Sequence, residues 1–129
     1  MLFRSITLHA PKVGDRPIIG QTQLAAMKSS AIIVNTARGT LIDEVALTEA
    51  LLTGQLAGAG LDVFSEEPPP TDHPLFKCDN VIVTPHSASL TAEAAVRMAV
   101  MSVKNVLDFF EGRLDSSLVV NRDVIQFGL

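Results

Sequence analysis

The sequence contains no tryptophan, no tyrosine and a single cysteine, Cys78, in its 129 residues. A lone cysteine cannot form an internal disulfide and has no cysteine partner for a metal site, so we expect no metal centre. We interpret Cys78 as a small, partly buried apolar side chain. No apolar run approaches the roughly 20 residues that cross a bilayer, and the first residues lack the hydrophobic region of a signal peptide. We therefore expect a cytoplasmic protein with no membrane contact.

The sequence also lacks a concentration of positive charge. Its 10 Lys and Arg residues are scattered, and 14 Asp and Glu residues give a formal net charge of -4. Without a basic stripe to neutralise phosphates, nucleic acid is a poor candidate for a partner. A hydrophobic content of 47% with 19% charged residues is typical of a globular chain, and the length allows one domain.

Four short apolar runs stand out, each too short for a helix. They cover residues 6–10, 31–36, 57–63 and 81–84. Because they are continuously apolar rather than alternating, they predict strands that are covered on both faces in a parallel sheet.

Helical patterns lie between and after these runs, at residues 21–28, 43–53 and 91–111. Asp43 is placed to cap the second helix and Gly54 to end it, and Gly112 ends the third. The third carries an apolar stripe that we interpret as a face packed in a core, formed by Val96, Val100, Val103, Leu107 and Phe110. Residues 65–79, with four prolines, and residues 114–129 are predicted to be extended.

Strands that alternate with helices predict an α/β fold, with about four strands in a doubly wound parallel sheet and a long C-terminal helix. Ligands of such sheets bind beyond the carboxyl ends of the strands. Chemically useful residues follow three of the four runs at this edge: Arg38, Asp62 with Glu67, and His86. Taken singly, they could be a surface charge, a cap, a loop carboxylate and a structural histidine. Taken together, they form a set that could act on one substrate.

Such a set suits the reduction of a 2-oxo acid. The guanidinium of Arg38 can hold a substrate carboxylate with two hydrogen bonds. His86 can donate a proton to the carbonyl oxygen while a hydride from a nicotinamide reaches the carbon. A Glu67 carboxylate beside the imidazole would help it to keep its proton until transfer.

Five segments resemble consecutive signature blocks of the D-isomer-specific 2-hydroxyacid dehydrogenases, a family that includes hydroxypyruvate and glyoxylate reductases and phosphoglycerate dehydrogenase. They are LHAP, MKSSAIIVNTARGTLIDEVAL, AGAGLDVFSEEPP, HPLF and NVIVTPHSASLTAEA, and the resemblance runs from about residue 5 to 112. It implies an oxidoreductase with part of a Rossmann-like dinucleotide-binding domain, which uses NAD or NADP and a small 2-oxo or 2-hydroxy acid.

The resemblance also implies roles for individual residues. The family's catalytic Arg, Glu and His fall on Arg38, Glu67 and His86. Positions that line the cofactor fall on Ala10, Thr36, Ala37, Arg38, Asp62, His86 and Ala88. Gly39, Gly58 and Gly60 fit places where backbones approach closely, or they are simple turn and packing glycines. His9 and His73 gain no catalytic role, and we expect both to be structural, with His73 on the loop surface.

The sequence departs from the family pattern in three places. Residues 12–17, KVGDRP, replace a threonine-rich loop, and Ser89-Leu90 resembles a subset closer to hydroxypyruvate reductases. The third departure is that no G-x-G-x-x-G turn occurs in the sequence. We therefore expect residues 1–112 to form the C-terminal part of a dinucleotide-binding domain. Residues 113–129 would be a tail that returns to a substrate domain absent from this chain.

Loss of the glycine turn and its strand would expose the edge of the first predicted strand. We therefore expect a fragment that binds dinucleotide weakly alone and that associates as a homodimer or with a complementing N-terminal half. A non-catalytic interaction module of the same family, similar to a corepressor or to one piece of a split enzyme, is the alternative. The substrate stays open between several 2-hydroxy acids, with a hydroxypyruvate or glyoxylate reductase favoured.

Overall fold

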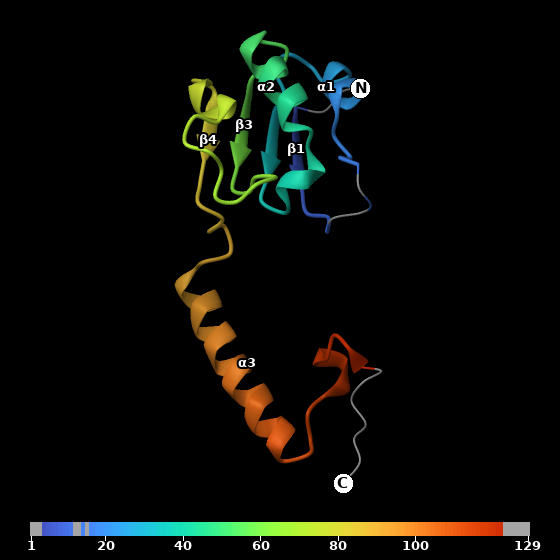
Figure 1. Ribbon diagram of the computed structural model, residues 1–129, viewed down its shortest axis with the longest axis vertical. Helices are drawn as coiled ribbons and strands as arrows, with labels where there is room; N and C mark the ends of the chain where they lie inside the picture. The colour runs from blue at the N-terminus through green and yellow to red at the C-terminus, as the bar shows by residue number, and fades with distance from the viewer. Residues whose placement is uncertain (1–3, 12–13, 15, 123–129) are drawn as a thin grey trace. The chain divides into compact units, whose positions relative to one another are not determined.

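The computed structural model describes residues 4–11, 14 and 16–122, which form two compact units, residues 4–88 and 89–122 (Figure 1). The first unit ends at Ala88, and its buried core contains side chains from residues 8 to 78. The assignment of residues 1–112 to part of a dinucleotide-binding domain stays a prediction. The role predicted for residues 113–129 stays a prediction, and residues 123–129 lie outside the described part. No helix in the described residues is long and apolar enough to span a membrane.

The first unit contains a sheet of four parallel strands, and its α/β architecture confirms the predicted fold class. The strands are β1 (Ser5–Leu8), β2 (Ile32–Asn35), β3 (Gly58–Leu61) and β4 (Val81–Val83). They lie in the order β1-β2-β3-β4, with every neighbouring pair parallel. Each strand falls within a predicted run or overlaps it. The carboxyl ends of all four strands therefore lie at one edge of the sheet.

Two short helices connect these strands. Helix α1 (Gln21–Ala25) is shorter than predicted, so Lys28 lies beyond its last turn, although Leu24 is buried as expected. Helix α2 (Glu44–Leu52) begins as predicted, because Asp43 Oδ1 accepts hydrogen bonds from the backbone N–H of the second and third helical residues. Gly54, with φ of +70°, follows its end.

The two loops predicted to be extended contain helical turns. The described residues contain three short 3-10 segments, η1 (Gly39–Leu41), η2 (Pro74–Lys77) and η3 (Ser116–Leu118), of which η2 and η3 lie in these loops. In η2 the buried side chain of Leu75 joins the core. The prediction of an extended chain is therefore wrong at η2 and η3, since side-chain caps at His73 and Asp115 favour a turn there.

The core fills one face of the sheet, the face in front of which α2 lies in Figure 1, and Leu24 of α1 is part of the same core. Its largest fully buried apolar side chains are Leu24, Ile33, Leu41, Leu47, Leu56 and Leu75. On the opposite face Ile32 is 46% exposed and Ile82 is 74% exposed. The prediction that both faces are covered is therefore wrong for the described residues, because both helices of this unit contribute to the same core.

The second unit contains helix α3 (Ala92–Phe110), which confirms the long predicted helix. Thr91 caps it by accepting a hydrogen bond from the backbone N–H of Ala94 at 3.1 Å, and Gly112 follows it with φ of +68°. Asp108 is buried between Lys104 and Arg113. The predicted apolar stripe, however, is not packed in a core within the described residues, since the exposed fractions of its large side chains range from 54% to 79%.

Candidate active site

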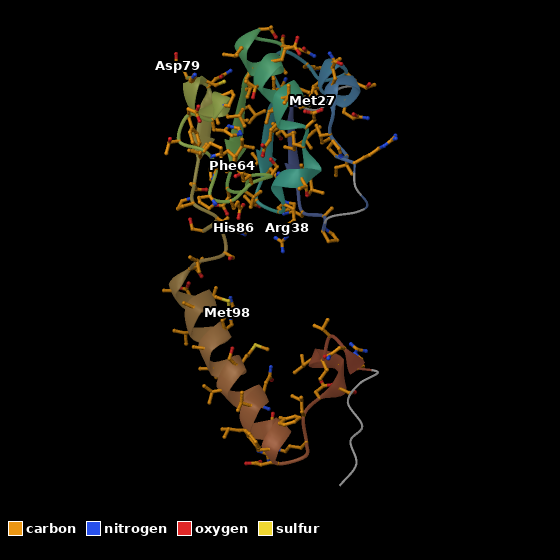
Figure 2. The ribbon with its side chains drawn as sticks, in the orientation of Figure 1. Met27, Arg38, Phe64, Asp79, His86 and Met98 are labelled. Atoms are coloured by element: carbon orange, nitrogen blue, oxygen red, sulfur yellow. The ribbon has the colours of Figure 1, made fainter. Side chains whose placement is uncertain are left out.

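The predicted site residues follow the carboxyl ends of the strands in the first unit. Figure 2 shows Arg38 and His86 at the end of the sheet toward which the strand arrows of Figure 1 point, with Met27 and Asp79 at the opposite end. Parallel pairing of neighbouring strands produces this arrangement, because each strand must leave the sheet at the same edge.

Glu67 and His86 form a direct pair at this edge. Glu67 Oε2 lies 2.7 Å from His86 Nδ1, and Glu67 Oε1 accepts a hydrogen bond from the backbone N–H of Phe64 at 3.0 Å. The hydrogen bond to His86 lowers the pKa of Glu67, and the Phe64 N–H and the charge of Arg38 lower it further. Glu67 is therefore a carboxylate at neutral pH, able to orient the imidazole.

The backbone of His86 adopts an uncommon conformation. Its φ is +52°, in the left-handed region that favours glycine. Its N–H donates to the carbonyl oxygens of Asp62 and Thr84, at 2.9 and 3.1 Å. A non-glycine residue stays in this region only where its surroundings hold it there, and such positions are common at functional sites.

Asp62 supplies most of that support. It is 3% exposed, its Oδ1 accepts from the Thr84 hydroxyl and the Ser87 N–H, and its Oδ2 accepts from the Ala88 N–H. Burial raises the pKa of Asp62, but the Thr84 hydroxyl and the two N–H groups lower it more, so the net shift is downward. Asp62 thus clamps the segment that carries His86, a role that sequence reasoning did not assign to it.

Arg38 is positioned by a residue that sequence reasoning missed. Asn35, 1% exposed at the end of β2, accepts a hydrogen bond from the Ala37 N–H at 3.1 Å and donates to the Arg38 carbonyl at 2.9 Å. The Arg38 side chain is exposed and donates from Nη1 to the carbonyl of Ala37. The sequence did contain a signal for this role, since Asn35 is a polar residue inside an apolar run. A buried side-chain amide needs hydrogen-bond partners, and here the backbone beside Arg38 provides them.

A cavity of about 390 Å³ adjoins the pair, a size within the range of small-molecule sites. Among the described residues its wall contains Asp62, Phe64, Glu67, Pro68, Pro69, Phe76, Val83, Thr84, Pro85 and His86. The structure thus brings three predicted site residues to one cavity. Arg38 lies at the same edge but outside this wall, Ala88 is bonded to Asp62, Ala10 packs against the core and Thr36 is exposed.

The three glycines that were predicted to lie at close backbone approaches differ in their surroundings. At Gly39 a Cβ would lie 1.9 Å from the Phe64 carbonyl carbon, and at Gly58 it would lie 2.9 Å from the Asn80 carbonyl oxygen, so these close approaches are confirmed. At Gly60 it would meet only methyl groups at 3.8 Å or more, so Gly60 is a packing glycine.

The two remaining histidines also differ from each other. His9 is exposed and lies 2.9 Å from the Thr7 hydroxyl. The His73 side chain is only 13% exposed, so its predicted place on the surface is wrong, because its ring packs against Phe64 and Phe76. Across residues 4–11, 14 and 16–122, no group of three histidine, cysteine or acidic side chains could hold a metal ion.

Residues 3–88 match the family model described as "D-isomer specific 2-hydroxyacid dehydrogenase, NAD binding domain". A glyoxylate reductase of Korarchaeum cryptofilum is 45% identical over 122 residues, which are 94% of this chain and 36% of that protein. The chain thus spans about a third of the length of this relative.

Solved structures show the same relationship. The NAD complexed form of a D-isomer specific 2-hydroxyacid dehydrogenase from Lactobacillus delbrueckii ssp. bulgaricus gives a TM-score of 0.80 at 35% identity, over 90% of this chain and 40% of that one. The NADPH-dependent glyoxylate/hydroxypyruvate reductase of Sinorhizobium meliloti, in complex with NADP and malonate, gives 0.75 at 31% identity, over 83% and 34%. With the family model matched over more than half of its length, this chain belongs to the D-isomer specific 2-hydroxyacid dehydrogenase family and corresponds to part of the NAD binding domain.

Proposed function

We propose that this chain provides the catalytic part of an NAD(P)-dependent oxidoreductase that interconverts a small 2-oxo acid and a D-2-hydroxy acid. The observation that carries the proposal is the 2.7 Å pair between Glu67 and His86, which lines a cavity at the carboxyl edge of the sheet. The names of the relatives support the reaction class, since they are reductases and dehydrogenases.

His86 is the proposed acid and base. Its Nδ1 is engaged by Glu67, and its Nε2 has no hydrogen-bond partner within the part of the chain that the structure describes. In reduction, Nε2 donates its proton to the substrate carbonyl oxygen as the carbonyl carbon receives a hydride. In oxidation, Nε2 takes the hydroxyl proton. Glu67 holds the ring so that this nitrogen faces the substrate.

Arg38 is the proposed anchor for the substrate carboxylate. Its guanidinium offers five N–H donors in a planar fork, and one nitrogen, Nη1, is bonded to the Ala37 carbonyl. The remaining donors suit a carboxylate held by two hydrogen bonds, which would also polarise the neighbouring carbonyl. Arg38 and His86 lie at the same edge of the sheet (Figure 2), which supports their acting on one substrate.

The residues at this edge fit the nicotinamide end of a dinucleotide. Asp62 Oδ2 accepts one hydrogen bond, from Ala88, and a carboxylate oxygen can accept two, so one position suits a carboxamide N–H. When bound, the cofactor would supply or accept the hydride. We propose that Ala10, Thr36, Ala37, Arg38, Asp62, His86 and Ala88 line its site. Relatives with NAD and with NADP support either cofactor.

The proposal assigns only the nicotinamide end to these residues, because the sequence has no G-x-G-x-x-G turn to hold a pyrophosphate. In the described sheet, β1 pairs with β2 and forms one edge. We propose that a complementing N-terminal segment with such a turn pairs along this edge, while a homodimer through other surfaces stays compatible with it.

The test is an assay of NADH and NADPH oxidation with glyoxylate or hydroxypyruvate. The chain would be measured alone and mixed with a glycine-turn segment taken from a relative. We expect turnover in the mixture and a loss of about 100-fold or more in His86→Asn, because the proton donor is removed.

Glu66→Gln is the matched control for Glu67→Gln, since the two carboxylates are neighbours and Glu66 is exposed. We expect Glu67→Gln to lower kcat and Glu66→Gln to leave it unchanged. Turnover that survives His86→Asn would contradict the proposal. Folded mixtures with no turnover on either acid would favour the alternative, a non-catalytic interaction module.

A further inference from the structure

Glu44, the first residue of α2, is hydrogen-bonded to Ser65 in the loop that follows β3. Its side chain is 15% exposed, and its two oxygens accept hydrogen bonds from the backbone N–H and the hydroxyl of Ser65, each at 2.6 Å. The two residues are 21 positions apart in the sequence. A carboxylate that accepts two donors from one residue fixes both its position and its orientation.

The same loop is held from a second direction. A Cβ on Gly39 would lie 1.9 Å from the carbonyl carbon of Phe64 and 2.3 Å from the nitrogen of Ser65. The segment that follows Arg38 therefore lies directly against the peptide between Phe64 and Ser65, and Glu44 binds the next atoms along it. This peptide is constrained by backbone contact on one side and by a carboxylate on the other.

His73 completes the arrangement. Its Nδ1 accepts a hydrogen bond from the Leu75 N–H at 3.3 Å, so the ring carries its proton on Nε2, which lies 3.4 Å from Glu44 Oε2. The ring also packs edge-on against Phe64, with centroids 5.4 Å apart. His73 thus contacts both Glu44 and Phe64, which precedes the serine that Glu44 binds.

The backbone of this loop also donates a hydrogen bond to Glu67 in the proposed active site. The N–H of Phe64 donates to Glu67 Oε1 at 3.0 Å, and Glu67 Oε2 contacts His86 Nδ1 at 2.7 Å. The Glu67 side chain is 37% exposed, so packing alone does not fix its orientation. The Phe64 N–H fixes Oε1, and the orientation of the carboxylate then decides whether Oε2 faces His86.

We propose that Glu44 is a positioning residue, which fixes the Phe64–Ser65 backbone so that Glu67 is held in the orientation that engages His86. The part of this inference that concerns turnover rests on the proposed function. The part that concerns the orientation of Glu67 stands on contacts within residues 39–86 and can be measured without turnover.

The experiment compares Glu44→Gln with Glu49→Gln in the full chain, by ¹³C NMR titration of the Glu67 carboxyl group. Glu49 is a matched control, because it lies on the same helix and is exposed. In the unsubstituted chain the pKa of Glu67 is lowered, mainly by the hydrogen bond to His86 and next by the hydrogen bond from the Phe64 N–H. We expect Glu44→Gln to raise the pKa of Glu67 toward its ordinary value and Glu49→Gln to leave it unchanged.

Ser65→Ala is the second variant, since it removes one of the two contacts and keeps the carboxylate. We expect a smaller shift in the same direction, and circular dichroism would verify that both variants fold. An unchanged pKa of Glu67 in folded Glu44→Gln and Ser65→Ala would overturn the proposal.

Activity provides a separate measurement. In the complemented enzyme we expect Glu44→Gln to lower kcat about tenfold with little change in KM, because substrate contacts remain and only the alignment of the acid is lost. If the mixture shows no turnover but the pKa of Glu67 still rises in Glu44→Gln, the proposed function fails while the positioning role stands.

Discussion

The two units of this chain use apolar side chains in opposite ways. In residues 4–88 the large aliphatic residues of α1, α2 and the strands converge on one core, and Leu47 and Ile33 are fully buried. In residues 89–122 the apolar stripe of α3 stays exposed, with Leu107 at 54% and Phe110 at 79%. The apolar stripe of α3 therefore predicts a helix, but a stripe predicts burial only where another element supplies the opposing surface.

The largest effect that would test this contrast comes from matched truncations. We expect Leu47→Ala to lower the free energy of unfolding by about 2–5 kcal/mol, because it leaves a cavity in the core. We expect Leu107→Ala to change it by less than about 0.5 kcal/mol, as at other exposed positions. Urea unfolding of both variants gives the comparison. Equal losses would show that the stripe of α3 is buried in solution.

A smaller effect is expected at the contact between the Arg38 and Glu67 segments. Gly39→Ala places a Cβ against the Phe64 backbone, so we expect a loss of about 1–3 kcal/mol in the free energy of unfolding. Gly20→Ala is the control, because the nearest atom to its added Cβ would lie 3.6 Å away on a flexible side chain. Thermal melts measure both, and a Gly39→Ala variant as stable as the control would argue against this close approach.

The smallest effect concerns pH. The pKa of Asp62 is lowered in the folded chain, so it contributes stability that is complete above its ordinary value, about 4, and is lost as the pH falls through the folded value. We expect the first unit to lose stability below about pH 4 in the native chain, and this slope to be shallower in Asp62→Asn. Circular dichroism melts between pH 7 and 3 measure the slopes. Identical slopes would contradict the assigned role of the carboxylate.

Local patterns were sufficient to predict most of the regular structure. Short apolar runs predicted all four strands, and the predicted cap at Asp43 marks the start of α2. These features depend on residues a few positions apart, so the sequence contains the whole signal. The length of α1 was overestimated because a five-residue helix has too few turns for a reliable period.

Contacts between distant segments could not be predicted in the same way. The low exposure of the His73 side chain and the hydrogen bonds from Ser65 to Glu44 depend on contacts between α2 and the loop that follows β3. The clamp of Asp62 on Ser87 and Ala88 joins residues 25 and 26 positions apart. Such contacts arise only once the sheet has formed, and the residue types alone allow many partners.

By itself, the sequence determined that the chain forms an α/β fold and that polar residues follow its strands at one edge, because strand and helix propensity are local. The tertiary structure decided which of those residues meet. It placed Glu67 against His86, 19 residues away, and it held His86 at a positive φ that few non-glycine residues adopt. The reason is physical: parallel pairing brings separate loops to one edge, and buried hydrogen bonds then select a single arrangement among them.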